Sequence, residues 1–317
     1  MVILNTKIGF GKTVIHLDIA KLHTGTPLDV PVIIQRAKKP GPIILLTAGI
    51  HGNEINGVEI VRQIIRKKYN IPKAGTIICI PVVNVFGFIN QERAFPDGRD
   101  LNRVFPGSKK GSLAARFAYH IMQEIVPHVD YVIDYHTGGE QRFNYSQIRI
   151  NADDLESLEL ASVFGSKFIL DSDNKGKTFR NSVTQLGKKV LLFEGGKTLN
   201  LDRIVTKTAI QGTLNVLHKL GMRPDAAEEF VQEDQYILNK TVWVRASKSG
   251  MYRSIAKLGS YVHKGEILGS ISDPYGLAEK VVKAPNDGFV ICSNHAPIVN
   301  QGDAIIHLST ESTILAQ

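Results

Sequence analysis

The stretch IILLTAGIHGNEINGVEIVRQII, residues 43–65, joins a strand pattern to a helix pattern. The run from Ile43 to Leu46 is apolar without alternation, which is typical of a strand that is buried on both faces. From Ile55 onward the apolar positions recur at helical spacing, which predicts an amphipathic helix. Between the two patterns, His51 and Glu54 stand three residues apart among glycines, and both side chains can bind a metal ion. The stretch therefore predicts a strand, a turn with candidate functional side chains, and a helix.

The same alternation of patterns continues over the first two thirds of the chain. Short apolar runs predict further buried strands over residues 76–83, 130–136 and 189–196. Helical spacing predicts further helices near residues 113–125, 154–164 and 202–220. Strands that alternate with helices build an α/β domain with a mainly parallel sheet. We therefore predict that residues 1–222 form an α/β domain whose mainly parallel or mixed sheet is flanked by helices.

The composition changes after residue 222. Residues 223–240 are polar and acidic and contain a proline, which is typical of a linker. From residue 241 to 317, short strand-like segments are separated by glycines, which predicts a small all-β domain with a hammerhead or barrel-like shape. Its glycine pattern resembles that of biotinyl and lipoyl carrier domains. Leu277 stands where those carriers have their modified lysine, and Lys280 lies too near the following strand, so we expect a structural cap over the cleft or an oligomer contact.

Charge and cysteine content bear on the class of partner. The net charge is +8, but the basic residues are scattered in short clusters, so we expect no nucleic-acid partner. A positive surface would also attract a small anionic substrate. Cys79 and Cys292 lie far apart, which argues against a disulfide framework and favours a reducing cytoplasm. No apolar run reaches the roughly 18 to 20 residues of a membrane helix, and the first residues lack a signal peptide's apolar core, so we expect a cytoplasmic protein without a membrane partner.

Polar side chains follow the predicted strands of the α/β domain. His51 and Glu54 come after the first strand, Asn84 after the second, His136 at the end of the third and Glu194 at the end of the fourth. Ligands of such sheets bind outside the carboxyl ends of the strands, so these side chains predict one site. A catalytic zinc ion takes three protein ligands from histidine and carboxylate, and two of them usually lie close in sequence. His51, Glu54 and His136 fit that scheme and predict one Zn²⁺ per subunit.

Four ordered motifs resemble one enzyme family. They are HGNE (51–54), DGRDLNRVFPG (97–107), DYHTGG (134–139) and FEGG (193–196). In order and spacing they resemble the succinylglutamate desuccinylase/aspartoacylase family, whose members are zinc-dependent amidohydrolases related in fold to the metallocarboxypeptidases. The resemblance covers most of residues 40–220. It implies that His51, Glu54 and His136 bind zinc, that Glu194 is the general base, and that a C-terminal β domain restricts the cleft.

The resemblance also implies roles for the DLNR region. Arg93 matches the arginine that polarises the scissile carbonyl, and Arg99 is the alternative because the spacing from Arg93 to Asn102 is slightly long. Asn102 and Arg103 match the pair that binds the substrate's α-carboxylate, for which the planar guanidinium fork is suited. Asp100 is expected to orient a metal ligand or an arginine.

Other candidates stay open at this stage. Tyr252 and Tyr275 are candidates for a tyrosine that reaches over the site from the second domain in some relatives. A second carboxylate of the substrate would need another cation from the regions 140–150 and 171–185, which we expect to be loops. The candidates there are Arg142, Arg149 and Arg180.

The predicted chemistry is hydrolysis of an amide that is not a peptide bond. Zinc lowers the pKa of bound water from about 15.7 towards 7, and a carboxylate outside the ligand set can pass the proton to the leaving amine. We expect a zinc-dependent amidohydrolase that removes a short acyl group, acetyl or succinyl, from a small anionic N-acyl amino acid, in a possible homo-oligomer. The alternatives are a metallocarboxypeptidase acting on peptides and a catalytically silent binding protein. The identities of the acyl group and of the amine stay open.

Overall fold

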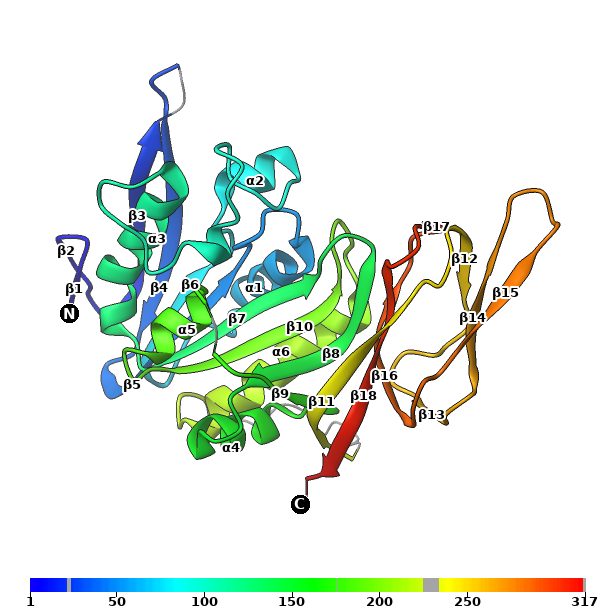
Figure 1. Cartoon of the computed structure of the whole chain (residues 1–317). Coiled ribbons are helices and arrows are strands. Elements are labelled where there is room, and N and C mark those ends of the chain that lie inside the picture. The colour runs from blue at the N-terminus through cyan, green and yellow to red at the C-terminus, as the bar shows by residue number, and fades with distance from the viewer. Residues whose placement is uncertain (22–23, 175, 225–233, 316–317) are drawn as a thin grey trace.

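A twelve-stranded sheet runs through most of the chain (Figure 1). The computed structural model describes residues 1–21, 24–174, 176–224 and 234–315. The helices are α1 (Ile55–Arg66), α2 (Val85–Asn90), α3 (Leu113–Glu124), α4 (Leu155–Phe164), α5 (Phe179–Thr184) and α6 (Arg203–Lys219), with short 3-10 helices η1 (Leu101–Arg103) and η2 (Val126–His128). None of these described helices combines the length and the apolar character that a bilayer crossing requires.

Strands of the first two thirds of the chain form one end and the middle of the large sheet. They are β3 (Gly11–Lys21), β4 (Pro27–Arg36), β5 (Lys39–Ala48), β6 (Ala74–Ile80), β7 (Tyr131–Gly138), β8 (Arg142–Ile150), β9 (Phe168–Asp171) and β10 (Lys189–Lys197). A separate small sheet pairs β1 (Val2–Ile3) with β2 (Thr6–Lys7). The C-terminal strands are β11 (Tyr236–Arg245), β12 (Gly250–Ser254), β13 (Tyr261–Val262), β14 (Ile267–Ser272), β15 (Glu279–Lys283), β16 (Gly288–Asn294), β17 (Ile298–Val299) and β18 (Ala304–Ile314).

The large sheet is mixed and has helices on both faces. Its order is β13-β16-β18-β11-β9-β8-β10-β7-β5-β6-β4-β3, and the central β6, β5, β7 and β10 are parallel. Helices α1, α4 and α6 pack on one face through side chains such as Ile60, Phe164 and Ile210. Helices α3 and α5 cover the other face through side chains such as Phe117 and Val183. The predicted α/β fold with a mixed, helix-flanked sheet is therefore confirmed.

The predicted loops over 140–150 and 171–185 are wrong in large part. Strand β8 occupies Arg142–Ile150, and helix α5 occupies Phe179–Thr184. Strand β8 could not be recognised from apolar periodicity, because several of its buried side chains are polar. These are Asn144, Ser146 and Gln147.

The C-terminal strands join the α/β part through a closed circuit of hydrogen-bonded strands. Strand β11 pairs with β9 and β18, β18 pairs with β16, and β16 returns to β8, which pairs with β9. Apolar side chains of these strands pack together, namely Phe168, Leu170, Leu238, Phe289 and Ile291. A four-stranded sheet, β15-β14-β12-β17, lies beyond this circuit (Figure 1).

The predicted linker over 223–240 differs from the structure at its end. Residues 225–233 lie outside the described residues, but β11 already begins at Tyr236 and pairs there with Phe168 of β9. The strand-rich C-terminal region therefore starts before the predicted boundary at 241. The hammerhead shape of that region stays a prediction.

Glycines in the turn and helix after β5 allow a close approach of backbones. A Cβ atom on Gly52 would lie 1.9 Å from the backbone carbon of Gly87 in α2. A Cβ atom on Gly57 would lie 2.6 Å from the carbonyl oxygen of Tyr135 in β7. The glycines among which His51 and Glu54 stand thus let α1 and α2 pack directly against neighbouring backbone.

We expect Gly57→Ala to destabilise the protein, although alanine is the better helix former by about 1 kcal/mol. The added methyl group meets rigid backbone rather than a side chain that can move, and overpacking of this kind costs about 1–3 kcal/mol. Thermal unfolding should show a melting temperature several degrees below that of the wild type. Gly9→Ala is the matched control, because a Cβ atom there has nothing within 4 Å. Equal melting temperatures for Gly57→Ala and the control would contradict the packing argument.

Candidate active site

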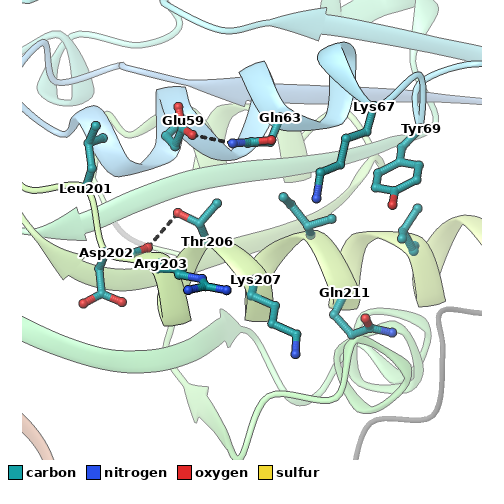
Figure 2. Close-up of a pocket in the computed structure, with 12 residues that line it drawn as sticks. Glu59, Gln63, Lys67, Tyr69, Leu201, Asp202, Arg203, Thr206, Lys207 and Gln211 are labelled. Atoms are coloured by element: carbon teal, nitrogen blue, oxygen red, sulfur yellow. Dashed lines mark hydrogen bonds between the residues drawn. The ribbon is translucent and has the colours of Figure 1, made fainter.

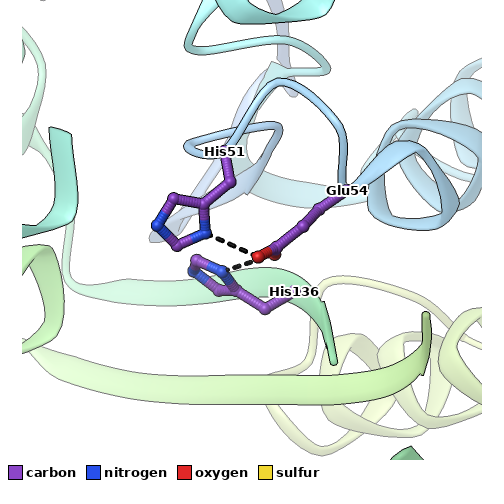
Figure 3. Close-up of side chains that lie close together, drawn as sticks. All are labelled: His51, Glu54 and His136. Carbon is purple, nitrogen blue, oxygen red and sulfur yellow. Dashed lines mark hydrogen bonds and ion pairs between the residues drawn. The ribbon is translucent and has the colours of Figure 1, made fainter. Parts of the chain in front are cut away.

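Three predicted metal ligands come together in the structure (Figure 3). His51 lies in the turn after β5, Glu54 is the residue before α1, and His136 lies on β7. The Nδ1 atom of His51 lies 2.6 Å from Oε1 of Glu54, and Nδ1 of His136 lies 2.9 Å from Oε2. One ligand atom from each residue lies within 4.8 Å of the others, and all of these side chains are buried. The arrangement brings together side chains that are up to 85 positions apart in the sequence.

Each imidazole has a second carboxylate on its far side. His51 Nε2 lies 3.0 Å from Oδ1 of Asp100, and His136 Nε2 lies 2.8 Å from Oδ2 of Asp134. A carboxylate in this position holds the proton on Nε2 and leaves Nδ1 free for a metal ion. This is the kind of role that the sequence predicts for Asp100, whereas Asp134 was not among the predicted residues. The signal was present, because Asp134 stands two residues before His136 on a strand and so shares its face.

The electrostatics of the cluster favour positive charge between its members. Burial alone would lower the pKa of His136, but the carboxylates of Asp134 and Glu54 raise it well above the usual value. Burial would raise the pKa of Glu54, but His51 and His136 lower it instead. Two imidazole nitrogens and a carboxylate are also a donor set that zinc accepts. The residues present therefore fit a zinc ion.

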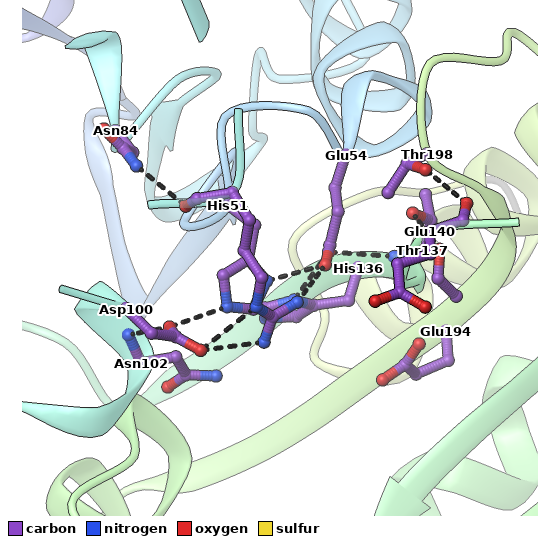
Figure 4. Close-up of polar contacts among 12 residues, drawn as sticks. His51, Glu54, Asn84, Asp100, Asn102, His136, Thr137, Glu140, Glu194 and Thr198 are labelled. Atoms are coloured by element: carbon purple, nitrogen blue, oxygen red, sulfur yellow. Dashed lines mark hydrogen bonds and ion pairs between the residues drawn. The ribbon is translucent and has the colours of Figure 1, made fainter. Parts of the chain in front are cut away.

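The structure distinguishes the two candidate arginines. The guanidinium of Arg93 donates to Asp100 Oδ2 at 3.1 and 2.9 Å, and its Nη1 lies 3.3 Å from Glu54 Oε1. Figure 4 shows these two carboxylates, Asp100 and Glu54, beside His51. Arg99 pairs with Asp97 and does not line the same pocket. Of the two arginines, only Arg93 lies at the histidine–glutamate cluster.

Asn84 supports the site from outside the pocket. Its side chain accepts from the backbone of Gly87 and so caps α2, and its Nδ2 donates to the carbonyl of Arg93 at 3.2 Å. It is absent from the described lining of the pocket, so it holds the Arg93 loop rather than facing a ligand.

Asn102 and Arg103 lie in the same pocket as the cluster. Asn102 is buried and its Oδ1 accepts from the backbone of Phe179 at 2.8 Å, which fixes the start of α5. Arg103 is exposed, donates to the carbonyl of Asn102 and forms no ion pair within the described part of the chain. Its guanidinium is therefore available to an anionic ligand.

Glu194 lies directly beside His136. The two residues are paired in register on the parallel strands β10 and β7. Oε2 of Glu194 accepts from Nδ2 of Asn144 at 2.8 Å, and Oε1 lies 3.8 Å from Nη1 of Arg149. Strand alternation places Leu192 and Glu194 towards the pocket. Glu194 is thus a carboxylate next to the cluster but outside its ligand set.

A pocket of about 540 Å³ contains these groups and extends to the C-terminal region. Trp243 of β11 lines it, which the sequence analysis missed. Its ring stacks on that of His307 at 4.3 Å and 5°, and the Arg142 guanidinium lies 5.9 Å from the indole. Burial and the charge of Arg149 lower the pKa of His307 to about 3, so this ring is neutral at physiological pH.

The remaining candidates separate into two groups. Arg142 and Arg149 line the pocket, whereas Arg180 is buried and donates to Ser172 and to the carbonyl of Asp173. Neither candidate tyrosine lines the pocket. Tyr252 packs in the core of the C-terminal region, and Tyr275 is 82% exposed.

A second cavity of about 490 Å³ lies between α1 and α6, which pack on the same face of the sheet (Figure 2). Lys67 and Tyr69 line it from the end of α1, and Arg203, Lys207 and Gln211 line it from α6. Of the described residues that line it, none belongs to the predicted site. The predicted chemistry therefore stays with the first pocket.

Known proteins share sequence with this chain. A sequence model of the succinylglutamate desuccinylase/aspartoacylase catalytic domain matches residues 40–220. An N-alpha-acetyl-L-2,4-diaminobutyric acid deacetylase from Halomonas elongata is 27% identical over 295 residues, which are 87% of this chain and 84% of the relative.

Solved structures share the fold. A succinylglutamate desuccinylase/aspartoacylase from Rhodobacter sphaeroides matches with a TM-score of 0.85 and 22% identity, over 98% of this chain and 97% of that one. The product-bound ectoine utilization protein EutE (DoeB) from Ruegeria pomeroyi matches with a TM-score of 0.83 and 20% identity, over 96% of each chain. The mixed α/β fold is therefore one already known from desuccinylase/aspartoacylase structures.

Trp243 is the single tryptophan of the chain and lines the pocket, so its fluorescence should report ligand binding there. We expect a small carboxylate ligand such as aspartate or glutamate to change the emission in a saturable way, because binding alters the polarity beside the indole. Fluorescence titration measures this change. A tryptophan analogue free in solution serves as the control for inner-filter effects. Emission that stays constant while calorimetry shows binding would place the ligand away from Trp243.

Proposed function

Because the chain belongs to the succinylglutamate desuccinylase/aspartoacylase family, we propose that it is a zinc-dependent amidohydrolase. It removes a short acyl group, of the acetyl or succinyl class, from an N-acyl amino acid. The observation that carries this proposal is the convergence of His51, Glu54 and His136, with the carboxylate of Glu194 beside them in one pocket.

The metal ligands in this proposal are His51, Glu54 and His136, for one zinc ion per subunit. When bound, zinc supplies a Lewis acid at this point of the pocket. Asp100 and Asp134 keep the two imidazoles in the orientation and tautomer that metal binding requires. The protein's other groups then act around this centre.

Glu194 serves as the general base. Its carboxylate takes a proton from the attacking water, whose oxygen forms a bond to the acyl carbon, and passes that proton to the amine nitrogen as the carbon–nitrogen bond breaks. Arg93 lies at the cluster, where a hydrogen bond to Asp100 orients its guanidinium group. This group stabilises the negative charge that develops on the carbonyl oxygen. Proton transfer and charge stabilisation thus come from different residues of the pocket.

Substrate size and charge follow from the lining of the pocket. Arg103 and Asn102 bind the α-carboxylate of the amino acid, because a guanidinium fork suits a carboxylate. Arg142 and Arg149 add positive charge, which favours a small anionic substrate. A volume of about 540 Å³ is typical of pockets for small molecules and favours an N-acyl amino acid over a polypeptide. The name of the Halomonas relative supports the acetyl class.

We expect Glu194→Gln to lower turnover by about 10²–10⁴-fold, because glutamine cannot accept the proton. The variant should still bind about one zinc ion per chain, since Glu194 stands outside the ligand set. Amine release from acetyl-, succinyl- and formyl-amino acids measures turnover, and elemental analysis measures the metal. Glu140→Gln is the matched control, because Glu140 is an exposed carboxylate that lines the same pocket. Turnover at the wild-type rate in Glu194→Gln would refute the base assignment.

Zinc should stabilise the folded protein, because its ligands converge only in the native state. We expect the melting temperature of chelator-treated protein to rise by several degrees when zinc is added. His136→Ala should abolish this rise, because it removes one of three ligands. Differential scanning fluorimetry with and without zinc measures the effect. A full zinc-induced rise in His136→Ala would exclude this residue from the metal site.

A further inference from the structure

The carboxylate of Glu194 has a single hydrogen-bond donor among the described side chains. Nδ2 of Asn144 donates to Oε2 at 2.8 Å, while Oε1 has only the guanidinium of Arg149 near it, at 3.8 Å. That second distance exceeds a hydrogen bond. One oxygen of Glu194 is therefore held, and the other is free to face the pocket.

A β-bulge puts Asn144 in this place. On β8, Gln147 is paired with Glu194 of β10, but the next pair joins Asn144 to Gly196, so β8 contains one residue more than β10 between these pairs. Asn144 and Arg149 are an odd number of positions apart, so regular alternation would direct them to opposite faces. Because of the bulge, both line the pocket.

Asn144 is also paired with a C-terminal strand, on the edge of β8 opposite to β10. Cys292 of β16 is paired with Asn144, His307 of β18 is paired with Cys292, and Trp243 of β11 is paired with His307. Asn144 is itself 5% exposed, so it has little freedom to adopt another rotamer. The ladder of paired residues thus runs from the C-terminal region to the carboxylate of Glu194.

We propose that Asn144 is a positioning residue for the general base. This inference rests on the proposed function, and it extends that function to a residue that no motif contains. The amide of Asn144 fixes Oε2 of Glu194 and leaves Oε1 as the proton acceptor. Because the donor is neutral, it orients the carboxylate without the strong stabilisation of negative charge that an arginine would give.

The test replaces the amide with an apolar side chain of similar size. Asn144→Leu should lower kcat by about 10- to 100-fold, because misplacement of a reacting group by about 1 Å costs that much. KM and zinc content should stay within about twofold of the wild type, since the residue contacts neither substrate nor metal in this scheme. Ser146→Ala is the matched control on the same strand, with wild-type kcat expected.

A double-mutant cycle separates positioning from a general structural role. In the Glu194→Gln background, Asn144→Leu should change the residual rate by less than about threefold, because there is no base left to position. An equal loss in both backgrounds would overturn the proposal. Wild-type kcat in the single variant would also overturn it. Asn144→Ser, which is smaller and cannot reach Oε2, is the second variant if the leucine variant does not fold.

A structural readout keeps this inference distinct from the proposed function. Crystal structures of the wild type and of Asn144→Leu should show the Glu194 carboxylate in different orientations. An unchanged carboxylate would overturn the positioning role, whether or not any acyl-amino acid is hydrolysed. Failure of the wild-type zinc protein to hydrolyse every acyl-amino acid tested would overturn the proposed function, and the two crystal structures would still decide the role of Asn144.

Discussion

The buried carboxylate of Glu54 ties three parts of the chain together. One of its oxygens faces His51, and the other faces His136 and accepts from the backbone of Thr137 at 3.0 Å. A buried charge is costly unless it is paired, so the chain must bring the turn after β5 and the end of β7 to the same place. Arg93 adds a further positive charge from a separate loop. The geometry of the histidine–glutamate cluster and the packing of the sheet are therefore set by the same contacts of Glu54.

Much of the α/β part could be predicted from local patterns. The strand and helix in residues 43–65 appear as β5 and α1, because apolar periodicity reports directly which side chains are buried. The cluster of three buried side chains could be found for a related reason. The binding site of a parallel sheet lies at the carboxyl ends of its strands. Polar residues at these strand ends therefore indicate a site even when no contact between them is known. His51, Glu54 and His136 all belong to this class.

The rest of the site depends on contacts that no local pattern reports. Asn144 faces Glu194 because of a bulge, and a bulge is defined by the pairing of two strands rather than by either sequence alone. Trp243 reaches the pocket because β11 pairs with β9 and β18, which are far from it in the chain. Asp134 differs from these residues, since strand alternation was sufficient to place it beside His136.

The closed circuit of β8, β9, β11, β18 and β16 has a consequence for how substrate enters. A hinge between the two regions would have to break the backbone hydrogen bonds between β9 and β11 and those between β8 and β16 at once, since both pairs join the α/β part to the C-terminal strands. Opening of the pocket by rotation of whole domains is therefore unfavourable. Smaller motions are then expected to admit a ligand, such as those of exposed side chains that line the pocket, of which Arg103 is one; rotamers of this kind change in picoseconds to nanoseconds.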